Sequence, residues 1–487
     1  MIIFFHPRST KPRSRRFPIS VLSIAALLEG KEDYAIVDGN VDRAHLQTLT
    51  SLIRHHKVEL LAVSVMPGPQ MVAGMEACHF LHQHFPMIPI VWGGYFPSLY
   101  PDAVLNAPYV DFVVRGQGEE TFQELLGALR SGTGFREVLG LSFKDTDGSH
   151  VHNRERPMKS PDAFPWLPYH RVQPEKYILP TFLGKRTAVH QASVGCPYPC
   201  TFCGVVSVFG NREKMEAPAR TESILRHLKD SYGIDSIQFY DNNFFLREDH
   251  AQELCERLKP LKLKWWCEAR IDILLRYSDI TLRSIREAGC EMIFFGAESG
   301  SDWVLKEMKK HLTTNQTIEL ARRIRQFGII PEFSFVVGNP RDPDRDTREC
   351  LQFIRKIKKI NPASEIILQH YIPVPQRETM YGNIQDQIQF PGTIEEWASE
   401  RWLNFTLRKE PGVSWLPSRV KEQIDQFEVV LNSRWPTVQD IRLPAWGRAL
   451  LRTLGSWRYL SGIYAYPKEL VWAQKLIDLR KPKAESL

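Results

Sequence analysis

The sequence lacks any run of 18 consecutive apolar residues, so it predicts no transmembrane helix. It also shows no internal repeat and no low-complexity tract, which argues against a solenoid or an extended tail. An apolar tetrad stands at the N-terminus and the basic residues follow it, whereas a secretory signal has the opposite order and a longer apolar region. We therefore expect a cytoplasmic protein.

Cysteine is sparse, with eight in 487 residues. An even number could indicate disulfides, but the cytoplasm is reducing and disfavours them in a long chain. Five of the thiols stand singly in apolar surroundings and are predicted to be buried core residues. These five are Cys78, Cys255, Cys267, Cys290 and Cys350. The other three are clustered and require a different explanation.

The chain has a small excess of positive charge, and this excess lies near the C-terminus. The net charge is +7, and residues 401–487 carry 15 Lys and Arg against 8 Asp and Glu, so the rest of the chain is nearly neutral. No Lys/Arg-rich run of the nucleic-acid-binding type occurs in residues 401–487, and Arg13, Arg15 and Arg16 form only a short basic loop. The pattern predicts no nucleic-acid partner.

The apolar content is ample for several cores. Hydrophobic residues make up 43% and charged residues 24%, as in soluble globular proteins, and the length suggests about three domains. Residues 1–135 alternate strand and helix signals, which predicts a doubly wound, Rossmann-like α/β domain with its ligand at the carboxyl ends of the strands. Residues 136–185 are Pro-rich and are predicted to be a linker, with a short hairpin near residues 140–152. The strands predicted for the first domain are Ile2–Phe5, Tyr34–Val37, Leu60–Val65, Ile88–Trp92 and Phe112–Val114.

A second strand and helix series occupies residues 186–394. Its six β/α units predict a partial (β/α)6 barrel with a site at the carboxyl ends of the strands. Residues 395–487 hold seven of the twelve tryptophans and are predicted to be a mainly helical region that caps the barrel, with helices such as Val420–Leu431 and Leu470–Leu479. The predicted barrel strands are Ala188–Val194, Ser236–Tyr240, Lys264–Ala269, Met292–Phe295, Glu332–Val337 and Glu365–Tyr371.

The clustered cysteines, Cys196, Cys200 and Cys203, share one tight loop in which Pro197 and Pro199 discourage helix. Three thiolates are one short of the four that fill an iron–sulfur cubane, so one iron would remain open. A zinc loop that borrows a distant ligand and a chance cluster are the alternatives. A zinc site usually shows a second Cys/His pair at short spacing, and none follows here.

This loop resembles the radical SAM signature CxxxCxφC, with Phe202 at the aromatic position. The resemblance implies a [4Fe–4S] cluster whose open iron binds S-adenosylmethionine (SAM). It also implies reductive cleavage to a 5′-deoxyadenosyl radical, with an electron donor such as flavodoxin or ferredoxin. Taken singly, the barrel positions that match the family's SAM contacts are ordinary turns at strand ends. The expected SAM-binding residues are Phe202, Tyr240, Asp241, Asn242, Glu268, Arg270, Glu298, Ser299 and Gly338.

Residues 1–135 resemble the cobalamin-binding domain that precedes the barrel in one radical SAM subclass. The alternative is a Rossmann-like domain that binds another nucleotide or nothing, but the fingerprint GxGxxG after the first strand is absent. The motif Asp-x-His-x-x-Gly is also absent there, so we predict cobalt without a histidine from that motif, although His6 lies near the right place. The expected cobalamin-binding residues are Ser64, Pro67, Gly68, Gly93, Gly94, Gly116, Gly118 and Glu119.

The subclass implies methyl transfer to an unactivated carbon of a small metabolite, or alternatively cyclisation or ring rearrangement. A methylthiotransferase acting on RNA would need a further N-terminal cysteine triad, and Cys78 stands alone there. A non-catalytic cobalamin sensor would not need the three clustered cysteines. The Trp-rich C-terminal region is either a set of buried anchors or a sign of a lipophilic substrate and peripheral membrane contact.

Overall fold

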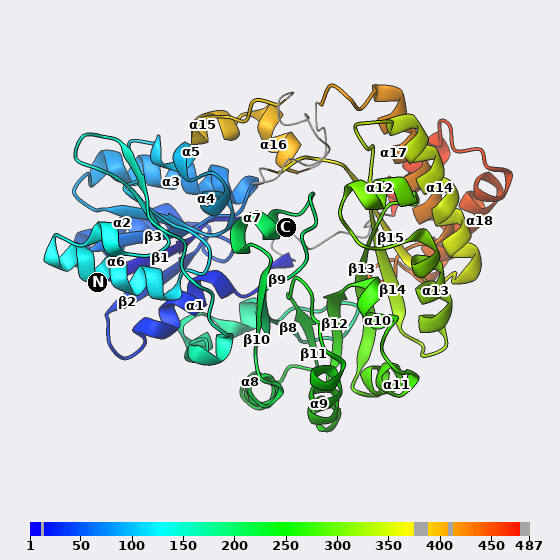
Figure 1. The fold of residues 1–487 in the computed structure, drawn as a ribbon, viewed down its shortest axis with the longest axis horizontal. Coiled ribbons are helices and arrows are strands. Elements are labelled where there is room, and N and C mark those ends of the chain that lie inside the picture. Colours follow the sequence, from blue (N-terminus) through cyan, green and yellow to red (C-terminus); the bar gives the residue numbers. More distant parts are fainter. Residues whose placement is uncertain (11–13, 375–387, 408–412, 478–487) are drawn as a thin grey trace.

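The computed structural model describes residues 1–10, 14–374, 388–407 and 413–477. Arg13 and the last residues of the predicted helix Leu470–Leu479 lie outside them. Two α/β bodies stand side by side, with the N-terminal domain in blue and cyan and the barrel in green and yellow (Figure 1). None of the helices in the described residues combines the length and the apolar composition that a membrane span requires.

The N-terminal domain contains a seven-stranded sheet in the order β2-β1-β3-β4-β5-β6-β7. The five predicted strands are confirmed and run parallel, and their apolar runs are continuous because helices cover both faces. The hairpin predicted near residues 140–152 pairs antiparallel with β5, so it extends this sheet into the predicted linker. The strands are β1 Ile2–His6, β2 Tyr34–Asp38, β3 Leu60–Ser64, β4 Ile90–Gly93, β5 Phe112–Val114, β6 Leu141–Lys144 and β7 His150–His152.

Two helices pack on one face of this sheet and the others on the opposite face. The helices α1 (Ile19–Leu28) and α6 (Glu119–Ser131) share one core with the strands. The second core, on the other face, is built from α2 to α5. These helices are α2 His45–His55, α3 Pro69–His84, α4 Tyr95–Leu99 and α5 Pro101–Leu105.

The barrel is a parallel sheet of six strands in the order β15-β14-β13-β12-β11-β8, which confirms a partial barrel. Successive side chains of a barrel strand point to opposite faces of the sheet, as expected. Trp265 packs in the core with the helices, and the next residue, Trp266, packs in a separate cluster inside the barrel. The predicted strand Ala188–Val194 is wrong in one respect, because it divides into two strands that belong to different sheets. The barrel strands are β8 Thr187–His190, β11 Ser236–Phe239, β12 Lys264–Ala269, β13 Cys290–Glu298, β14 Ile330–Val337 and β15 Glu365–His370.

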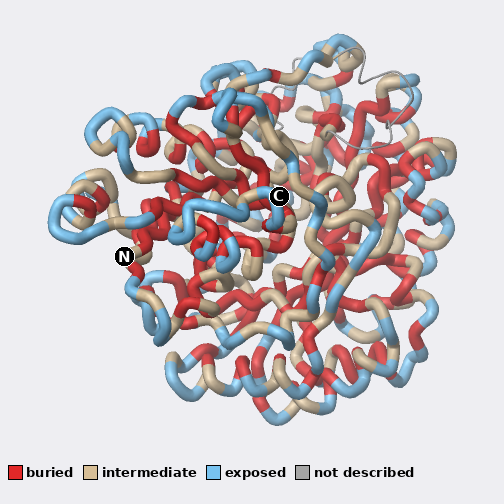
Figure 2. The backbone as a smooth tube through the Cα atoms, turned by 60° about the vertical axis from the view of Figure 1, so that its left-hand side comes forward, coloured by how far each residue is buried: buried red, intermediate tan, exposed pale blue. Residues whose placement is uncertain are grey.

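The division occurs at Ala192, whose N–H donates to the Asp241 carboxylate at 3.3 Å and whose carbonyl accepts from Glu216 N–H at 2.7 Å. After this point β9 (Ser193–Cys196) leaves the barrel and pairs antiparallel with β10 (Arg212–Met215). Helices bury the outer face of the barrel. They are α8 Pro218–Tyr232, α9 Glu248–Leu258, α10 Ile271–Leu274, α11 Asp279–Glu287, α13 Thr314–Arg325 and α14 Pro343–Ile360. Two shorter helices, α7 Gly204–Phe209 and α12 Asp302–Glu307, lie outside this core. Buried segments of the backbone, in red, lie mainly inside the molecule, and exposed segments, in pale blue, lie at its surface (Figure 2).

The C-terminal region is helical, as predicted, but its described helices pack in two separate places, and its role as a cap over the barrel stays a prediction. Helices α15 (Ile394–Trp397) and α16 (Glu400–Thr406) lie over the N-terminal domain, and Trp397 packs within its second core. Helix α17 (Ser418–Arg434) instead packs on α14 and β15 at the far side of the barrel (Figure 1). The last two helices, α18 (Ala445–Ser461) and α19 (Lys468–Leu476), pack on α17.

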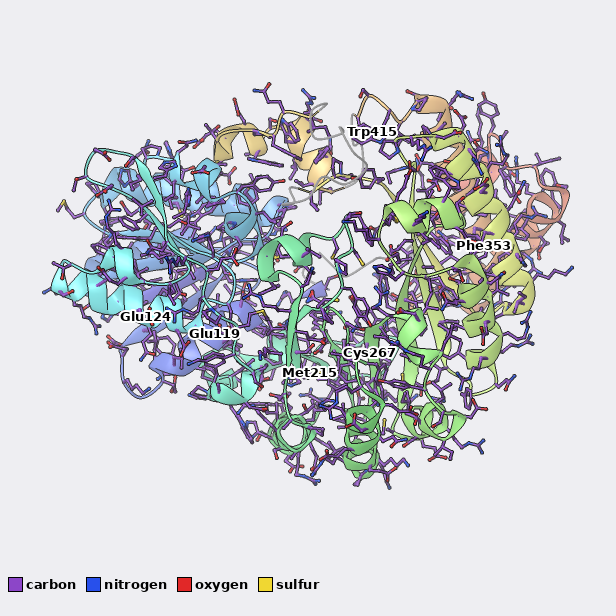
Figure 3. The ribbon with its side chains drawn as sticks, in the orientation of Figure 1. Glu119, Glu124, Met215, Cys267, Phe353 and Trp415 are labelled. Atoms are coloured by element: carbon purple, nitrogen blue, oxygen red, sulfur yellow. The ribbon has the colours of Figure 1, made fainter. Side chains whose placement is uncertain are left out.

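The five isolated cysteines are all buried, as predicted. Figure 3 shows one of them, Cys267, among the barrel strands. Burial raises the pKa of the Cys78 thiol to about 12 by desolvation. The Cys78 thiol therefore stays protonated, and burial places all five cysteines in the core.

Candidate active site

The three clustered cysteines lie on the loop that joins β9 to α7. Gly195, just before Cys196, has a φ of 84°, and a Cβ there would lie 2.2 Å from the Arg212 carbonyl oxygen, so the hairpin requires glycine. On the other side of the loop, Thr201 N–H donates to Met308 O at 3.1 Å. The cysteine loop is therefore fixed on one side by the β9–β10 hairpin and on the other side by the barrel.

Burial raises the pKa of Cys196 to about 11 and that of Cys203 to about 12, so binding of a cluster has to displace the protons of both thiols. In the described part of the chain, no three His, Cys, Asp or Glu side chains converge on a single metal ion. A cubane has its irons at separate corners, and its thiolates need not converge. Three cysteines on one loop, with no second Cys/His pair at short spacing in the sequence, suit a [4Fe–4S] cluster better than a zinc site.

Arg270, predicted to contact SAM, lies directly against the cluster loop. Its guanidinium donates to Cys200 Sγ at 3.6 Å and to the Lys310 carbonyl at 2.6 Å, and it stacks 3.6 Å from the centre of the Tyr198 ring. An ion pair with Asp272 at 2.9 Å fixes its orientation. This cation is positioned to stabilise the negative charge of the thiolates.

A second cation, Lys310, was missed because its sequence context is that of a surface lysine. Its Nζ donates to Glu298 Oε1 at 2.7 Å, and both side chains are buried. The Lys310 ammonium also lies 5.7 Å from the centre of the Phe202 ring. Nearby Glu298 and Cys200 oppose the effect of burial, so the pKa of Lys310 is raised. A Cβ at Gly296 would lie 2.1 Å from Glu298 Oε1, so this position leaves room for the pair.

Replacing Lys310 with methionine is expected to lower the free energy of unfolding by about 3 kcal/mol, because the Glu298 carboxylate would stay buried without its partner. The double variant Lys310→Met/Glu298→Gln should regain most of this loss. Urea unfolding of the apoprotein measures both. Equal losses in the single and double variants would contradict the buried pair.

Buried polar groups without protein partners occur on strand β10 and just after strand β11. Within the described residues, both side-chain amide atoms of Asn243 and both carboxylate oxygens of Glu213 have no hydrogen-bond partner. Burial, with the nearby charge of Asp241, raises the pKa of Glu213 to about 8, and burial raises that of Asp241 to about 6. Two carboxyl groups and an amide suit a ligand with cationic groups, and SAM carries an ammonium and a sulfonium.

The remaining predicted SAM residues at β11 and β12 stand at the same edge of the barrel. Arg16 Nε, from the N-terminal domain, donates to Tyr240 Oη at 2.9 Å and so joins that domain to the barrel mouth. Asn242 is partly buried beside Asp241, and the Glu268 carbonyl accepts from Phe244 N–H at 2.8 Å. The basic loop noted in the sequence therefore reaches the site.

Ser299 and Gly338 are brought together by Asp346, which the sequence did not indicate. The Ser299 hydroxyl donates to Asp346 Oδ1 at 3.1 Å, and Gly338 N–H donates to Oδ2 at 2.9 Å. Gly338 has a φ of 93°, which favours glycine. Asp346 thus holds the turns after β13 and β14 in one position.

Burial raises the pKa of Asp346 to about 6, above its ordinary value. A carboxyl with a raised folded pKa binds more protons in the folded state, so its contribution to stability falls as pH rises from about 4 to about 6. We expect Asp346→Asn to remove this dependence. From pH 4 to pH 7 the variant's free energy of unfolding should gain about 3 kcal/mol relative to the parent. Denaturant unfolding of both apoproteins tests this, and parallel pH profiles would contradict it.

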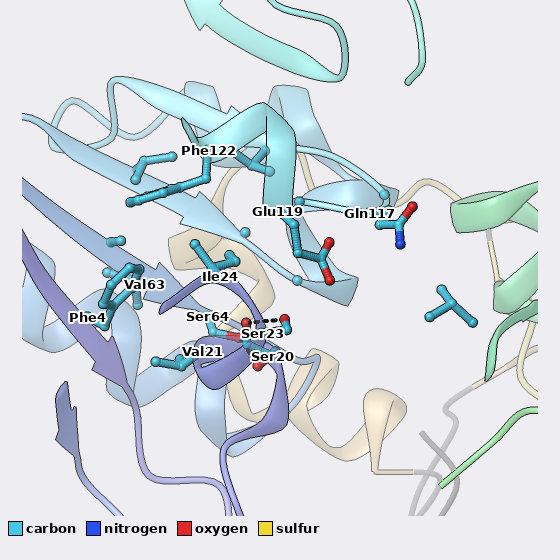
Figure 4. Close-up of a pocket in the computed structure, with 18 of the residues that line it drawn as sticks. Phe4, Ser20, Val21, Ser23, Ile24, Val63, Ser64, Gln117, Glu119 and Phe122 are labelled. Atoms are coloured by element: carbon cyan, nitrogen blue, oxygen red, sulfur yellow. Dashed lines mark hydrogen bonds between the residues drawn. The ribbon is translucent and has the colours of Figure 1, made fainter. Parts of the chain in front are cut away.

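A cleft of about 800 Å³ opens at the carboxyl ends of the N-terminal strands, between α1 and α6 (Figure 4). Ser64 Oγ and Ser20 Oγ are hydrogen bonded at 2.7 Å on its floor, and burial raises the pKa of Glu119 at its rim. Pro67 and Gly68 do not line it, and Gly68 faces Leu407 near α16. The predicted cobalamin residues in its wall are Ser64, Gly93, Gly94, Gly116, Gly118 and Glu119.

The glycines give this cleft its shape. Gly94 has a φ of 102°, and a Cβ there would lie 2.9 Å from Val65 O, so only glycine fits between β3 and β4. An apolar cleft with a flat glycine wall fits a large planar cofactor such as cobalamin. His6 does not line the cleft, and its ring nitrogens lie 3.2 and 3.3 Å from Gln70 Nε2. Cobalt without a histidine ligand stays a prediction.

The cleft and the cluster loop share walls. Val194 of β9 and Phe209 of α7 line the cleft, on either side of the cysteine loop in the chain. Helix α7 packs on α4, where a Cβ at Gly204 would lie 2.2 Å from Tyr95 Oη. The candidate sites for the cluster and for cobalamin are therefore neighbours.

Residues 10–126 match the model of the B12 binding domain, and residues 191–354 match that of the radical SAM superfamily. The chain is a radical SAM enzyme. More particularly, it belongs to the radical SAM proteins that carry an N-terminal B12-binding domain. The cofactors of these two domains are those predicted: cobalamin, SAM and a [4Fe–4S] cluster.

Two proteins of similar sequence and one solved structure show which enzymes the chain resembles. An uncharacterized methyltransferase of Pyrococcus horikoshii is 26% identical over 70% of this chain and 73% of its own. The anaerobic magnesium-protoporphyrin IX monomethyl ester cyclase of Synechocystis is 26% identical over 77% of this chain and 75% of its own. The cobalamin-dependent SAM radical enzyme OxsB, solved with aqua-cobalamin and SAM, has the same fold, with a TM-score of 0.67 and 17% identity over 98% of this chain and 75% of its own.

Proposed function

We propose that this enzyme transfers a methyl group to an unactivated carbon of a small, lipophilic metabolite. The shared wall of the cobalamin cleft and the cysteine loop carries this proposal, because a methyl donor and a hydrogen-abstracting radical must reach the same carbon. When bound, the cluster and SAM supply a 5′-deoxyadenosyl radical, and cobalamin supplies the methyl group.

The chain's own residues would hold and shield these partners. Cys196, Cys200 and Cys203 would bind the cluster, with the Arg270 guanidinium beside Cys200 Sγ. Glu213 and Asn243 would face the cationic groups of SAM. The aromatic rings of Tyr240 and Trp266 line the barrel interior and would exclude water from the substrate. A flavodoxin or ferredoxin would provide the electron, and we expect the enzyme in the cytoplasm.

Cyclisation or ring rearrangement is the second candidate, and the cyclase relative from Synechocystis favours it. The two reactions differ in the fate of SAM. Methyl transfer consumes a second SAM to restore the methyl donor and produces S-adenosylhomocysteine, whereas cyclisation produces 5′-deoxyadenosine alone.

The test is anaerobic reconstitution with hydroxocobalamin, carbon-13 methyl-labelled SAM, a reductant and a lipid extract of cells, so that every transferred methyl group comes from SAM. Methylation predicts a product that carries the labelled methyl group, with S-adenosylhomocysteine and 5′-deoxyadenosine in equal amounts. A product without label and without S-adenosylhomocysteine would overturn the proposal in favour of cyclisation. Label found only in water-soluble products of a polar extract would overturn the lipophilic substrate.

A further inference from the structure

Helix α18 exposes an apolar stripe to solvent. Trp446, Leu450, Trp457 and Leu460 follow one another at intervals of four, seven and three residues, which places them on one helical face. Trp446 is 62% exposed and Leu460 is 73% exposed. The opposite face of α18, with buried Leu451, packs on α17 and α19.

The loop after α18 and helix α19 continue this surface. Tyr466 is 71% exposed and Trp472 is 67% exposed, and Leu476 follows Trp472 by one helical turn. Leu451 of α18 and Ala473 of α19 meet in one small core, so the outward sides of the two helices adjoin. We call this surface the C-terminal apolar face. It consists of Trp446, Leu450, Trp457, Leu460, Ile463, Tyr466, Trp472 and Leu476.

The charges on α18, α19 and the loop between them are mostly positive. Residues 441–477 contain six Lys and Arg and a single acidic residue, Glu469. Glu469 is bound to Arg458 in an ion pair, so it does not offset the exposed cations. The exposed cations are Arg442, Arg452, Lys468 and Lys475.

We propose that the C-terminal apolar face docks on an anionic membrane surface. Tryptophan and leucine side chains flanked by lysine and arginine are typical of helices that lie in the lipid interface, where the rings enter the headgroup region and the cations meet acidic lipids. Contact of this kind is peripheral, since no helix among the described residues could span a bilayer. The docking is independent of the reaction proposed above.

The contact would hold the barrel at a fixed orientation. Helix α17 joins α18 and α19 to β15, and the segment before α18 enters the barrel, where Gln439 Nε2 donates to Glu332 Oε1. Val438 N–H donates to Glu365 Oε1 at 3.0 Å at the start of β15. The apolar face therefore cannot tilt freely relative to the barrel.

The test is flotation of the full-length holoenzyme with phosphatidylcholine vesicles, with and without phosphatidylglycerol. Binding is expected only with phosphatidylglycerol, and it should weaken as salt is raised. The double variant Trp446→Ser/Trp457→Ser and the charge variant Arg452→Gln/Lys475→Gln should each lower the bound fraction about tenfold. Unchanged absorbance of the bound cluster shows that each variant is folded.

The matched control is Met87→Ser/Ile280→Ser, which removes two apolar side chains exposed elsewhere, at 90% and 78%. It should float like the parent protein. The proposal fails if the parent does not bind anionic vesicles or if the control loses as much binding as the tryptophan variant. It also fails if sedimentation shows that the parent is a dimer and the tryptophan variant a monomer, because the face would then bind a second copy.

Discussion

Replacing Cys200 with alanine is expected to lower SAM cleavage by about a thousandfold or more. Cys200 is one of three cluster ligands, and two thiolates would leave a second iron without protein support. The loop itself should persist, because Thr201 and Gly195 hold it through the backbone. The variant should therefore fold, lose the broad visible absorption of the cluster and contain little iron. Iron analysis and 5′-deoxyadenosine formation measure the two effects.

The matched control is Cys255→Ala. Cys255 is buried in the barrel core among α9 residues, and losing its sulfur should cost only about 1 kcal/mol of stability. Iron content and SAM cleavage should match the parent. A Cys200→Ala variant that kept its iron and its activity would show that the cluster lies elsewhere.

Replacing Gly93 with leucine is expected to weaken cobalamin binding about a hundredfold, equivalent to about 2.7 kcal/mol. Gly93 and Val91 share the face of β4 that lines the cleft, so the new side chain would project into it. A Cβ at Gly93 meets only ordinary contacts, the nearest being Val114 O at 3.7 Å, so the fold should tolerate the change. Spectroscopic titration with hydroxocobalamin measures the affinity.

Gly127→Leu provides the comparison, because Gly127 is exposed on the same domain and a Cβ there meets nothing within 4 Å. This substitution should leave cobalamin affinity unchanged and stabilise α6 by about 1 kcal/mol, since glycine is a poor helix former. The Gly93→Leu variant should also retain its iron. Equal affinity in the two variants would mean that cobalamin does not enter this cleft.

The two α/β bodies were predictable because local patterns define them. Strands buried on both faces produce short apolar runs, and helices between parallel strands follow from the topology. The division between β8 and β9 was not predictable, because an apolar run does not indicate where a strand changes its partner. Likewise, the sequence did not indicate which tryptophans after residue 395 would be buried: Trp397 packs in the N-terminal domain, whereas Trp446 and Trp457 are exposed.

The candidate site was predictable where spacing along the chain sets it. The cysteine loop and the glycines at strand ends are local features. Three further residues interact with partners that are distant in the chain. Lys310 binds Glu298, 12 positions away, Asp346 binds Ser299, 47 positions away, and Glu213 lies near Asp241, roughly 30 positions away. The sequence around each of the three does not distinguish it from a surface charge. Their roles depend on burial, which only tertiary packing creates.

The N-terminal domain is completed by a segment from beyond the barrel. Trp397 is 1% exposed and packs against Phe96 and Tyr100, and Glu395 accepts a hydrogen bond from Tyr109 at 2.8 Å. The B12-binding unit is therefore discontinuous in the gene. Cutting the chain after residue 135 would expose an aromatic core, so exchanging this domain between related enzymes requires moving two separated stretches together.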